Sequence, residues 1–458
     1  MAKSRLIFLC SSCEARFPKW MGRCPECEAW NTVAEDLSAH GPEVVALPRR
    51  GQGAPIQALP LNEAEHPAGD SRLGTGLSEA DRVLGGGLPV GSVSLLGGDP
   101  GIGKSTLALQ VLSHVVGRGE GGLYVSGEES AAQVKARAER LGLEAGAIQL
   151  LATVELETVA AEIERLSPRL VVVDSIQTLR TQALDGIAGN VSQVRACADL
   201  LIRIAKRRGM AVLMVGHVTK EGQLAGPRTL EHMVDALLYL EGQMESPQRI
   251  LRSVKNRFGS TREIGLFTLG ERGMAEVKDP GALFLAERRK DAAGTVVFLG
   301  MEGTRVLPVE IQALVGDSTS THPQRTAVGV DANRVILLQA VIEKHLGEIF
   351  GGLDVYLNVA GGLRLGEPAL DAAVAAAMLS SFRNKPLPSD TVVFGEIGLT
   401  GEVRGVTGMG ERVAEAARMG FRRAVMPEPV PGAMIALPEG MQMDTVSDLK
   451  SLAEALFD

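Results

Sequence analysis

A chain of 458 residues, 45% of them hydrophobic and 22% charged, has ample apolar material for two or three globular domains, which excludes a largely disordered protein. Its formal net charge of −8 gives no general attraction to nucleic acid, so any such contact must come from local basic surface. No apolar run reaches the roughly 20 residues that span a bilayer, and the apolar run near the N-terminus is too short for a secretory signal. We therefore expect a cytoplasmic protein without membrane contact.

Four of the five cysteines lie in the first 27 residues, as two C-x-x-C pairs separated by ten residues. Four thiolates at this spacing can close a tetrahedron around Zn²⁺, and metal binding supplies folding energy that so small a module cannot obtain from its core. We predict a zinc module over residues 1–34 with the ligands Cys10, Cys13, Cys24 and Cys27. A pair of redox dithiols is the alternative. The nearby basic and aromatic residues either contact nucleic acid or only cover the module: Arg16, Lys19, Trp20, Arg23 and Trp30.

Residues 35–70 carry five prolines and no hydrophobic periodicity, which is typical of a linker. Strand-like and helix-like segments alternate regularly after it, over residues 71–289. This alternation predicts a mostly parallel sheet with helices on both faces.

A complete G-x-x-x-x-G-K-[ST] phosphate loop follows an apolar strand-like run at 92–96 and precedes an amphipathic helix. Its glycines allow successive N–H groups to point at phosphate oxygens, Lys104 would reach the β- and γ-phosphates, and Ser105 would hold Mg²⁺. We predict binding of ATP with Mg²⁺ by Gly98, Asp99, Pro100, Gly101, Ile102, Gly103, Lys104, Ser105 and Thr106. A chance glycine-rich turn is the alternative.

Two acidic positions follow strand-like segments whose C-terminal ends should meet at one edge of the sheet. Asp174 ends the apolar run 170–174 and is expected to position Mg²⁺ together with Ser105. Glu128 and Glu129 follow the strand expected at 122–126, and we favour Glu128 as the group that polarises the attacking water. Either or both could instead stabilise the next helix. His217, at the end of another strand, either senses the γ-phosphate or is structural.

Two further segments carry cations suited to phosphate contacts. Lys220 and Arg228 lie in a glycine-rich stretch, where they either hold a single-stranded backbone or belong to an ordinary surface loop. Lys255, Asn256 and Arg257 form a polar tip after a strand. Lys255 and Arg257 could act on a neighbouring protomer's triphosphate, or the tip could contact DNA.

The order of zinc knuckles, Pro-rich linker, phosphate loop, S-G-E-E-S and K-N-R-F-G closely resembles the RadA (Sms) family of bacterial recombination proteins over essentially the whole chain. The resemblance implies an α/β protein with an N-terminal zinc ribbon and a RecA-like P-loop ATPase core. It also implies a homo-hexameric ring that uses ATP to move along single-stranded DNA and promotes branch migration of branched intermediates, with a RecA-type recombinase and replication proteins as further partners. An ATP-switched clamp or mediator without processive translocation is the alternative, and a KaiC-like kinase shares the core.

Residues 290–458 resemble the α/β proteolytic domain of Lon proteases, whose chemistry needs a Ser nucleophile and a Lys base. By alignment the Ser position falls at Ala369 and the Lys position near Gly410, which offer neither group, and Arg412 nearby stays protonated. We expect a domain without protease activity that serves as a scaffold for ring assembly. Its basic residues either line a DNA path or are solvated surface: Arg305, Arg325, Arg334, Lys344 and Arg364.

Overall fold

The computed structural model describes residues 8–10, 15–17, 22–27, 33–35, 72–144, 146–216, 230–242, 244, 246–319, 322–429 and 435–458. Seven of the candidate site residues lie outside these ranges: Cys13, Lys19, Trp20, Trp30, His217, Lys220 and Arg228. The described residues fall into two compact units. The first includes the N-terminal strands, and the second includes two large sheets.

Three short strands near the N-terminus form an antiparallel sheet in the order β2-β1-β3. They are β1 (Phe8–Cys10), β2 (Arg16–Phe17) and β3 (Val33–Glu35). Cys24 and Cys27 lie between β2 and β3 in the sequence. Cys24 is buried, and Cys27 is exposed. A sheet of this size buries too little apolar surface to be stable alone, which agrees with the prediction of a metal-stabilised ribbon.

The first large sheet has nine strands in the order β14-β13-β12-β11-β6-β10-β9-β7-β8. The six strands from β11 to β8 run parallel, and β12, β13 and β14 continue the sheet with antiparallel pairing. This arrangement confirms the predicted mostly parallel sheet. The strands are β6 (Val93–Gly98), β7 (Gly122–Ser126), β8 (Gln149–Ala152), β9 (Leu170–Asp174), β10 (Ala211–Val215), β11 (Ala236–Glu241), β12 (Gln248–Asn256), β13 (Ile264–Gly270) and β14 (Gly273–Glu276).

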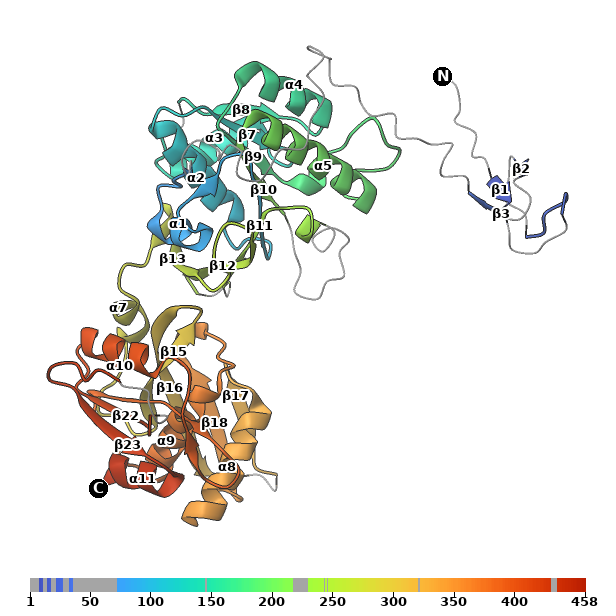
Figure 1. Ribbon diagram of the computed structural model, residues 1–458. Coiled ribbons are helices and arrows are strands. Elements are labelled where there is room, and N and C mark those ends of the chain that lie inside the picture. The colour runs from blue at the N-terminus through green and yellow to red at the C-terminus, as the bar shows by residue number, and fades with distance from the viewer. Residues whose placement is uncertain are drawn as a thin grey trace, which may run out of the picture. The chain divides into compact units, whose positions relative to one another are not determined.

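Helices flank this sheet (Figure 1). Local sequence sets their ends: the Ser130 side chain accepts a hydrogen bond from the Gln133 N–H at the start of α3, and Asn190 caps α5 in the same way. Apolar side chains of α2 and α5 then pack against the buried central strands. The helices are α1 (Ser78–Leu84), α2 (Lys104–Gly117), α3 (Ala131–Arg140), α4 (Leu156–Leu166) and α5 (Val191–Arg208), with the short strands β4 (Arg72–Leu73) and β5 (Leu88–Pro89) and the 3₁₀ turn η2 (Ile176–Thr178).

The second large sheet has seven strands in the order β17-β18-β16-β15-β19-β22-β23, with mixed parallel and antiparallel pairing. Its central helix α9 (Asp371–Phe382) is buried from Asp371 to Ser380, because its many alanines allow close approach to the strands. The strands are β15 (Thr295–Glu302), β16 (Arg305–Asp317), β17 (Arg325–Val328), β18 (Leu353–Val359), β19 (Thr391–Val393), β22 (Arg423–Pro427) and β23 (Gln442–Val446). The remaining elements are α7 (Pro280–Leu285), α8 (Ala332–Leu346), η3 (Ala360–Gly362), η4 (Pro368–Leu370), β20 (Glu396–Ile397), β21 (Val403–Arg404), α10 (Met409–Arg418) and α11 (Leu449–Phe457).

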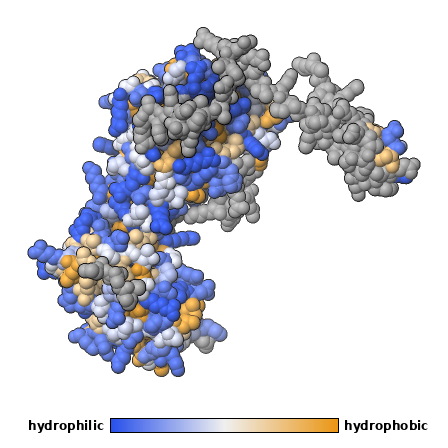
Figure 2. Space-filling model, viewed as in Figure 1, coloured by the Kyte–Doolittle hydropathy of each residue, from blue (hydrophilic) through white to orange (hydrophobic). Residues whose placement is uncertain are grey.

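The surface is mostly hydrophilic on the face seen in Figure 2, with apolar areas over the C-terminal part of the chain. Among the described helices, none combines the length and apolar composition needed to cross a bilayer. Two α/β sheets with an N-terminal ribbon confirm the predicted fold class. The limits 1–34, 35–70, 71–289 and 290–458 stay predictions.

Candidate nucleotide-binding site

The phosphate loop lies between the end of β6 and the start of α2, at the C-terminal edge of the parallel strands. Gly98 has a φ of 148°, and a Cβ there would lie 2.5 Å from the Leu240 carbonyl oxygen of β11. Gly103 at the N-terminus of α2 has a φ of 109°, which only glycine adopts without strain. The glycine spacing therefore meets two backbone requirements of this turn.

Lys104 bridges the loop from inside. Its side chain is buried, and Nζ donates hydrogen bonds of 2.8 Å to the Gly98 carbonyl and 2.9 Å to the Asp99 carbonyl. Burial lowers the pKa of Lys104, while the charges of Asp174, Asp99 and Glu128 act in the opposite direction. The loop thus presents an ammonium group that can exchange its two carbonyl partners for phosphate oxygens, which fits a nucleoside triphosphate with its Mg²⁺.

Asp174 is the last residue of β9, and it is hydrogen-bonded by Tyr124 of the adjacent strand β7. The Tyr124 hydroxyl donates a 2.6 Å hydrogen bond to Asp174 Oδ2. Burial and the Asp174 charge raise the pKa of Tyr124 well above its ordinary value, so the phenol keeps its proton and remains a donor. No local motif in the sequence marks Tyr124 as part of the site. Its partner lies 50 residues away, and only the β7–β9 register brings them together.

The structure distinguishes the two adjacent glutamates by their partners. Ser175, which follows Asp174 through a cis peptide bond, donates a 2.6 Å hydrogen bond to Glu128 Oε1. Glu129 instead forms an ion pair with Arg137 of α3. Glu128 also acts electrostatically on Lys104. Glu128 is therefore directed toward the phosphate loop and Glu129 toward the next helix.

The Lys255–Asn256–Arg257 tip lies at the opposite edge of the sheet from the phosphate loop. Asn256 pairs with Ala236 at the start of β11, and Leu240 at the other end of β11 pairs with Gly98. Four strand residues at about 3.3 Å each separate the two edges by about 13 Å. Within one protomer, Lys255 and Arg257 therefore do not meet the phosphate loop.

Backbone carbonyls and one carboxylate hold the tip in place. Lys255 Nζ donates to the carbonyls of Glu231 (2.6 Å) and His232 (3.3 Å). Asn256 Nδ2 contacts the carbonyls of Val83 and Leu84 at 3.4 Å each, and Asn256 Oδ1 accepts from the Phe258 N–H. Arg257 pairs with Asp235 at 3.3 Å, and half of its side chain remains exposed. Asn256 therefore shapes the tip, and Arg257 is available at the surface.

Three family models match parts of this chain. Residues 61–223 match the family described as AAA domain, residues 8–35 the rubredoxin metal binding domain, and residues 326–429 subunit ChlI of Mg-chelatase. The DNA repair protein RadA of Bacillus subtilis is 47% identical, with 93% of each chain covered. RadA of Pseudomonas aeruginosa is 46% identical over 100% of both chains.

The chain belongs to the RadA family of DNA repair proteins. This confirms the resemblance inferred from the order of motifs. The matched domains imply ATP with Mg²⁺ and Zn²⁺ as cofactors of this chain. Two solved structures of lower similarity each align with 45% of it. The KaiC-like protein PH0186 of Pyrococcus horikoshii is 22% identical, with 99% of that chain covered and a TM-score of 0.38. The RadB recombinase is 24% identical, with 100% of that chain covered and a TM-score of 0.37.

In the C-terminal part of the chain, the two positions at which a Lon-type protease needs its Ser and Lys hold Ala369 and Gly410. Ala369 is buried, and its carbonyl accepts a 2.8 Å hydrogen bond from the Gly395 N–H. Gly410 lies in the first turn of α10 beside open space. Arg412 is buried next to Glu367, with which it forms an ion pair. The guanidinium therefore fastens α10 to the segment before η4.

Three of the five cations expected to line a DNA path have partners within the chain. Arg305 pairs with Glu79, and Arg334 pairs with Asp371. Arg325 donates to the Gln339 side chain at 2.9 Å. The other two, Lys344 and Arg364, are exposed.

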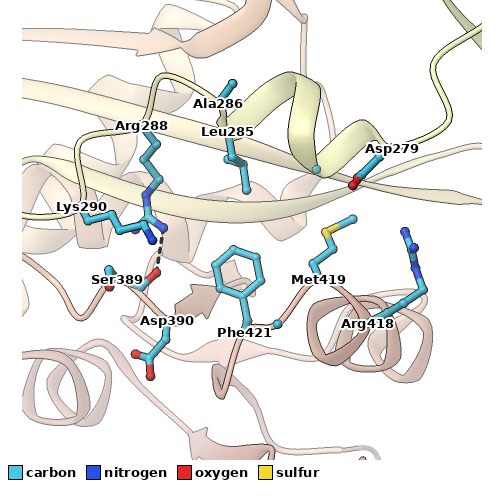
Figure 3. Close-up of a pocket in the computed structure, with 12 residues that line it drawn as sticks. Asp279, Leu285, Ala286, Arg288, Lys290, Ser389, Asp390, Arg418, Met419 and Phe421 are labelled. Atoms are coloured by element: carbon cyan, nitrogen blue, oxygen red, sulfur yellow. Dashed lines mark hydrogen bonds between the residues drawn. The ribbon is translucent and has the colours of Figure 1, made fainter.

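A cavity of about 460 Å³ lies where the segment after β14 meets the C-terminal sheet (Figure 3). Arg288 donates a 2.8 Å hydrogen bond to the Ser389 carbonyl there, and Leu285, Phe421 and Met419 also line the cavity. Burial lowers the pKa of Arg288 and raises the pKa of Glu310, and the two charges partly offset these shifts. The described lining contains none of the predicted site residues, so this cavity belongs to the attachment of α7 rather than to the nucleotide site.

Proposed function

We propose that this protein is a DNA-dependent ATPase of recombination and repair, a ring-forming motor that moves along single-stranded DNA and promotes branch migration. The proposal is carried by Lys104 and the three carboxylates that act on it, those of Asp99, Glu128 and Asp174, at one edge of a parallel sheet. A cation for the phosphates, an acid for the metal and a second acid for water are what ATP hydrolysis requires. The match to an AAA domain supports this use of the site.

The residues around the phosphate loop divide the steps of ATP binding and hydrolysis between them. Lys104 contacts the β- and γ-phosphates, and the loop residues from Gly98 to Thr106 surround them. Ser105 and Asp174 hold Mg²⁺, which supplies charge stabilisation to the phosphates. Glu128 polarises the attacking water while Ser175 orients its carboxylate.

We assign the residues at the opposite edge of the sheet to contacts with other molecules. Lys255 and Arg257 lie too far from their own phosphate loop, so we assign them to the triphosphate of a neighbouring protomer in a homo-hexamer. Contact with DNA phosphates, in which Asn256 would join, is the alternative. Lys220 and Arg228, outside the described residues, are assigned to single-stranded DNA.

The N-terminal and C-terminal parts have supporting roles. Cys10, Cys13, Cys24 and Cys27 hold a structural Zn²⁺, which the match to a metal binding domain over residues 8–35 supports. The C-terminal sheet is a scaffold without protease activity, because Ala369 and Gly410 provide neither nucleophile nor base. A RecA-type recombinase and replication proteins are the proposed partners, and the cytoplasm, where bacterial DNA lies, is the proposed location.

Strand displacement on a tailed DNA duplex tests the motor. The wild-type protein should displace the strand with ATP and show a preference for one tail polarity, and Lys104→Ala should lose displacement and ATP turnover together. Glu129→Gln, which changes the carboxylate that pairs with Arg137 of α3, is the matched control and should keep both activities. Slow turnover that is independent of the tail, without displacement, would instead favour an ATP-switched clamp.

A further inference from the structure

Arg249 of β12 lies against the phosphate loop, although it is 147 residues away in sequence. Its side chain is buried, and Nε donates a 3.0 Å hydrogen bond to the carbonyl oxygen of Ile102 inside the loop. Its terminal nitrogen Nη1 donates to the carbonyls of Gln248 (2.7 Å) and Ser246. The guanidinium thus joins the loop to the turn that precedes β12.

The backbone beside Arg249 leaves space for this side chain. A Cβ on Gly242 would lie 2.6 Å from the Gln248 carbonyl oxygen and 2.8 Å from Arg249 Cδ. Contacts this short would displace either the strand or the arginine. Glycine at position 242 therefore allows Arg249 to reach the loop.

The hydrogen bond to Ile102 fixes the orientation of a peptide group that belongs to the site. In a trans peptide the C=O and the N–H point in opposite directions. A carbonyl of Ile102 directed at Arg249 turns the N–H of Gly103 away from the guanidinium, and Gly103 N–H is one of the loop donors available to phosphate. A cation at the carbonyl also polarises the peptide and strengthens its N–H as a donor.

We propose that Arg249 is a positioning residue of the nucleotide site, which pre-orients the Ile102–Gly103 peptide so that the Gly103 N–H is ready to bind a triphosphate. Arginine suits this position because it retains its charge when buried, and its planar donors serve Ile102 and Gln248 at once. The inference rests on ATP binding and not on motor action.

Equilibrium affinities of the full-length protein, measured without DNA, test this role. We expect Arg249→Gln to weaken binding of Mg·ATP by roughly 10- to 100-fold, the range of one hydrogen bond to a charged group. Binding of adenosine, which has no phosphate, should stay within about twofold, because only the phosphate donors are affected. Arg249→Lys, which retains the charge, should recover a large part of the ATP affinity.

Arg252→Gln is the matched control, since Arg252 lies on the same strand and is partly buried but pairs with Glu241 and Glu302. It should bind ATP as the wild type does. Unchanged ATP affinity in folded Arg249→Gln, or equal losses for ATP and adenosine, would overturn the proposal, as would an equal loss in Arg252→Gln. Because no DNA is present, failure of the motor proposal would not alter these outcomes.

Discussion

Lys104 is held between a burial effect that disfavours its charge and three carboxylates that favour it. Burial dominates, so the pKa of the folded protein's Lys104 lies below that of a free lysine. Bound phosphates favour the ammonium form. ATP binding should therefore be coupled to protonation at alkaline pH.

We expect ATP affinity to fall as the pH rises through the lowered pKa of Lys104. This fall should occur at a lower pH than it would for an exposed lysine. Binding of ATP in this pH range should be accompanied by proton uptake. Calorimetric titration in buffers of different ionisation enthalpy measures this uptake. Lys104→Arg is the control. Its guanidinium does not titrate in this pH range, so the substitution should abolish the proton uptake. Equal proton uptake by wild type and Lys104→Arg would refute the assignment.

The neighbouring glutamates allow a direct test of the general base. Glu128→Gln should lower the single-turnover rate of ATP hydrolysis by about 100-fold or more, as expected for loss of a general base, with little change in ATP binding. Glu129→Gln loses the ion pair with Arg137 and should lower the thermal midpoint while hydrolysis stays within a few-fold of wild type. A larger loss of hydrolysis in Glu129→Gln would reverse the two roles.

At the scale of elements, the strand-to-helix turn and the strand ends could be predicted from the sequence. The residues from Gly98 to Ser105 and the strand ending at Asp174 depend on local spacing, and the structure has β6, α2 and β9 where they were expected. The partners of these residues could not be predicted. Tyr124 and Arg249 come from strands 50 and 147 residues away from the groups they bind, and only sheet register brings them there.

The position of the Lys255–Arg257 tip at the end of β12 leads to a complementation test. Lys104→Ala protomers keep an intact tip, and Arg257→Ala protomers keep an intact phosphate loop. If the tip acts on a neighbour, an equal mixture of these inactive variants should recover about a quarter of wild-type turnover, because random rings place an intact loop beside an intact tip at that frequency.

The same mixture distinguishes the two roles proposed for the tip. Each variant assayed alone provides the baseline, and an exchange step with dissociated protomers ensures mixed rings. If the mixture stays as inactive as each variant alone, the tip does not act on a neighbour, and contact with DNA is the remaining role.

At the scale of the molecule, the turn between β15 and β16 joins the two large sheets of the second unit. Arg305 pairs with Glu79 at 2.6 Å, and Glu302 pairs with Arg252 at 2.7 Å. The C-terminal hydrophobic core also includes Ile264 of β13. This attachment supports a scaffold that stays with the ATPase sheet. The sequence suggested Arg305 as a DNA contact, because charge pattern alone does not distinguish a solvated arginine from one that pairs with a distant glutamate.

ATP hydrolysis measured with and without single-stranded DNA, on wild type and Lys104→Ala, with the mass followed by light scattering, tests the central claim most directly. We expect DNA to accelerate turnover by a wild-type oligomer, and we expect Lys104→Ala to show no turnover under either condition. Wild-type turnover that ignores DNA, or hydrolysis that survives in Lys104→Ala, would contradict a DNA-dependent ATPase centred on this phosphate loop.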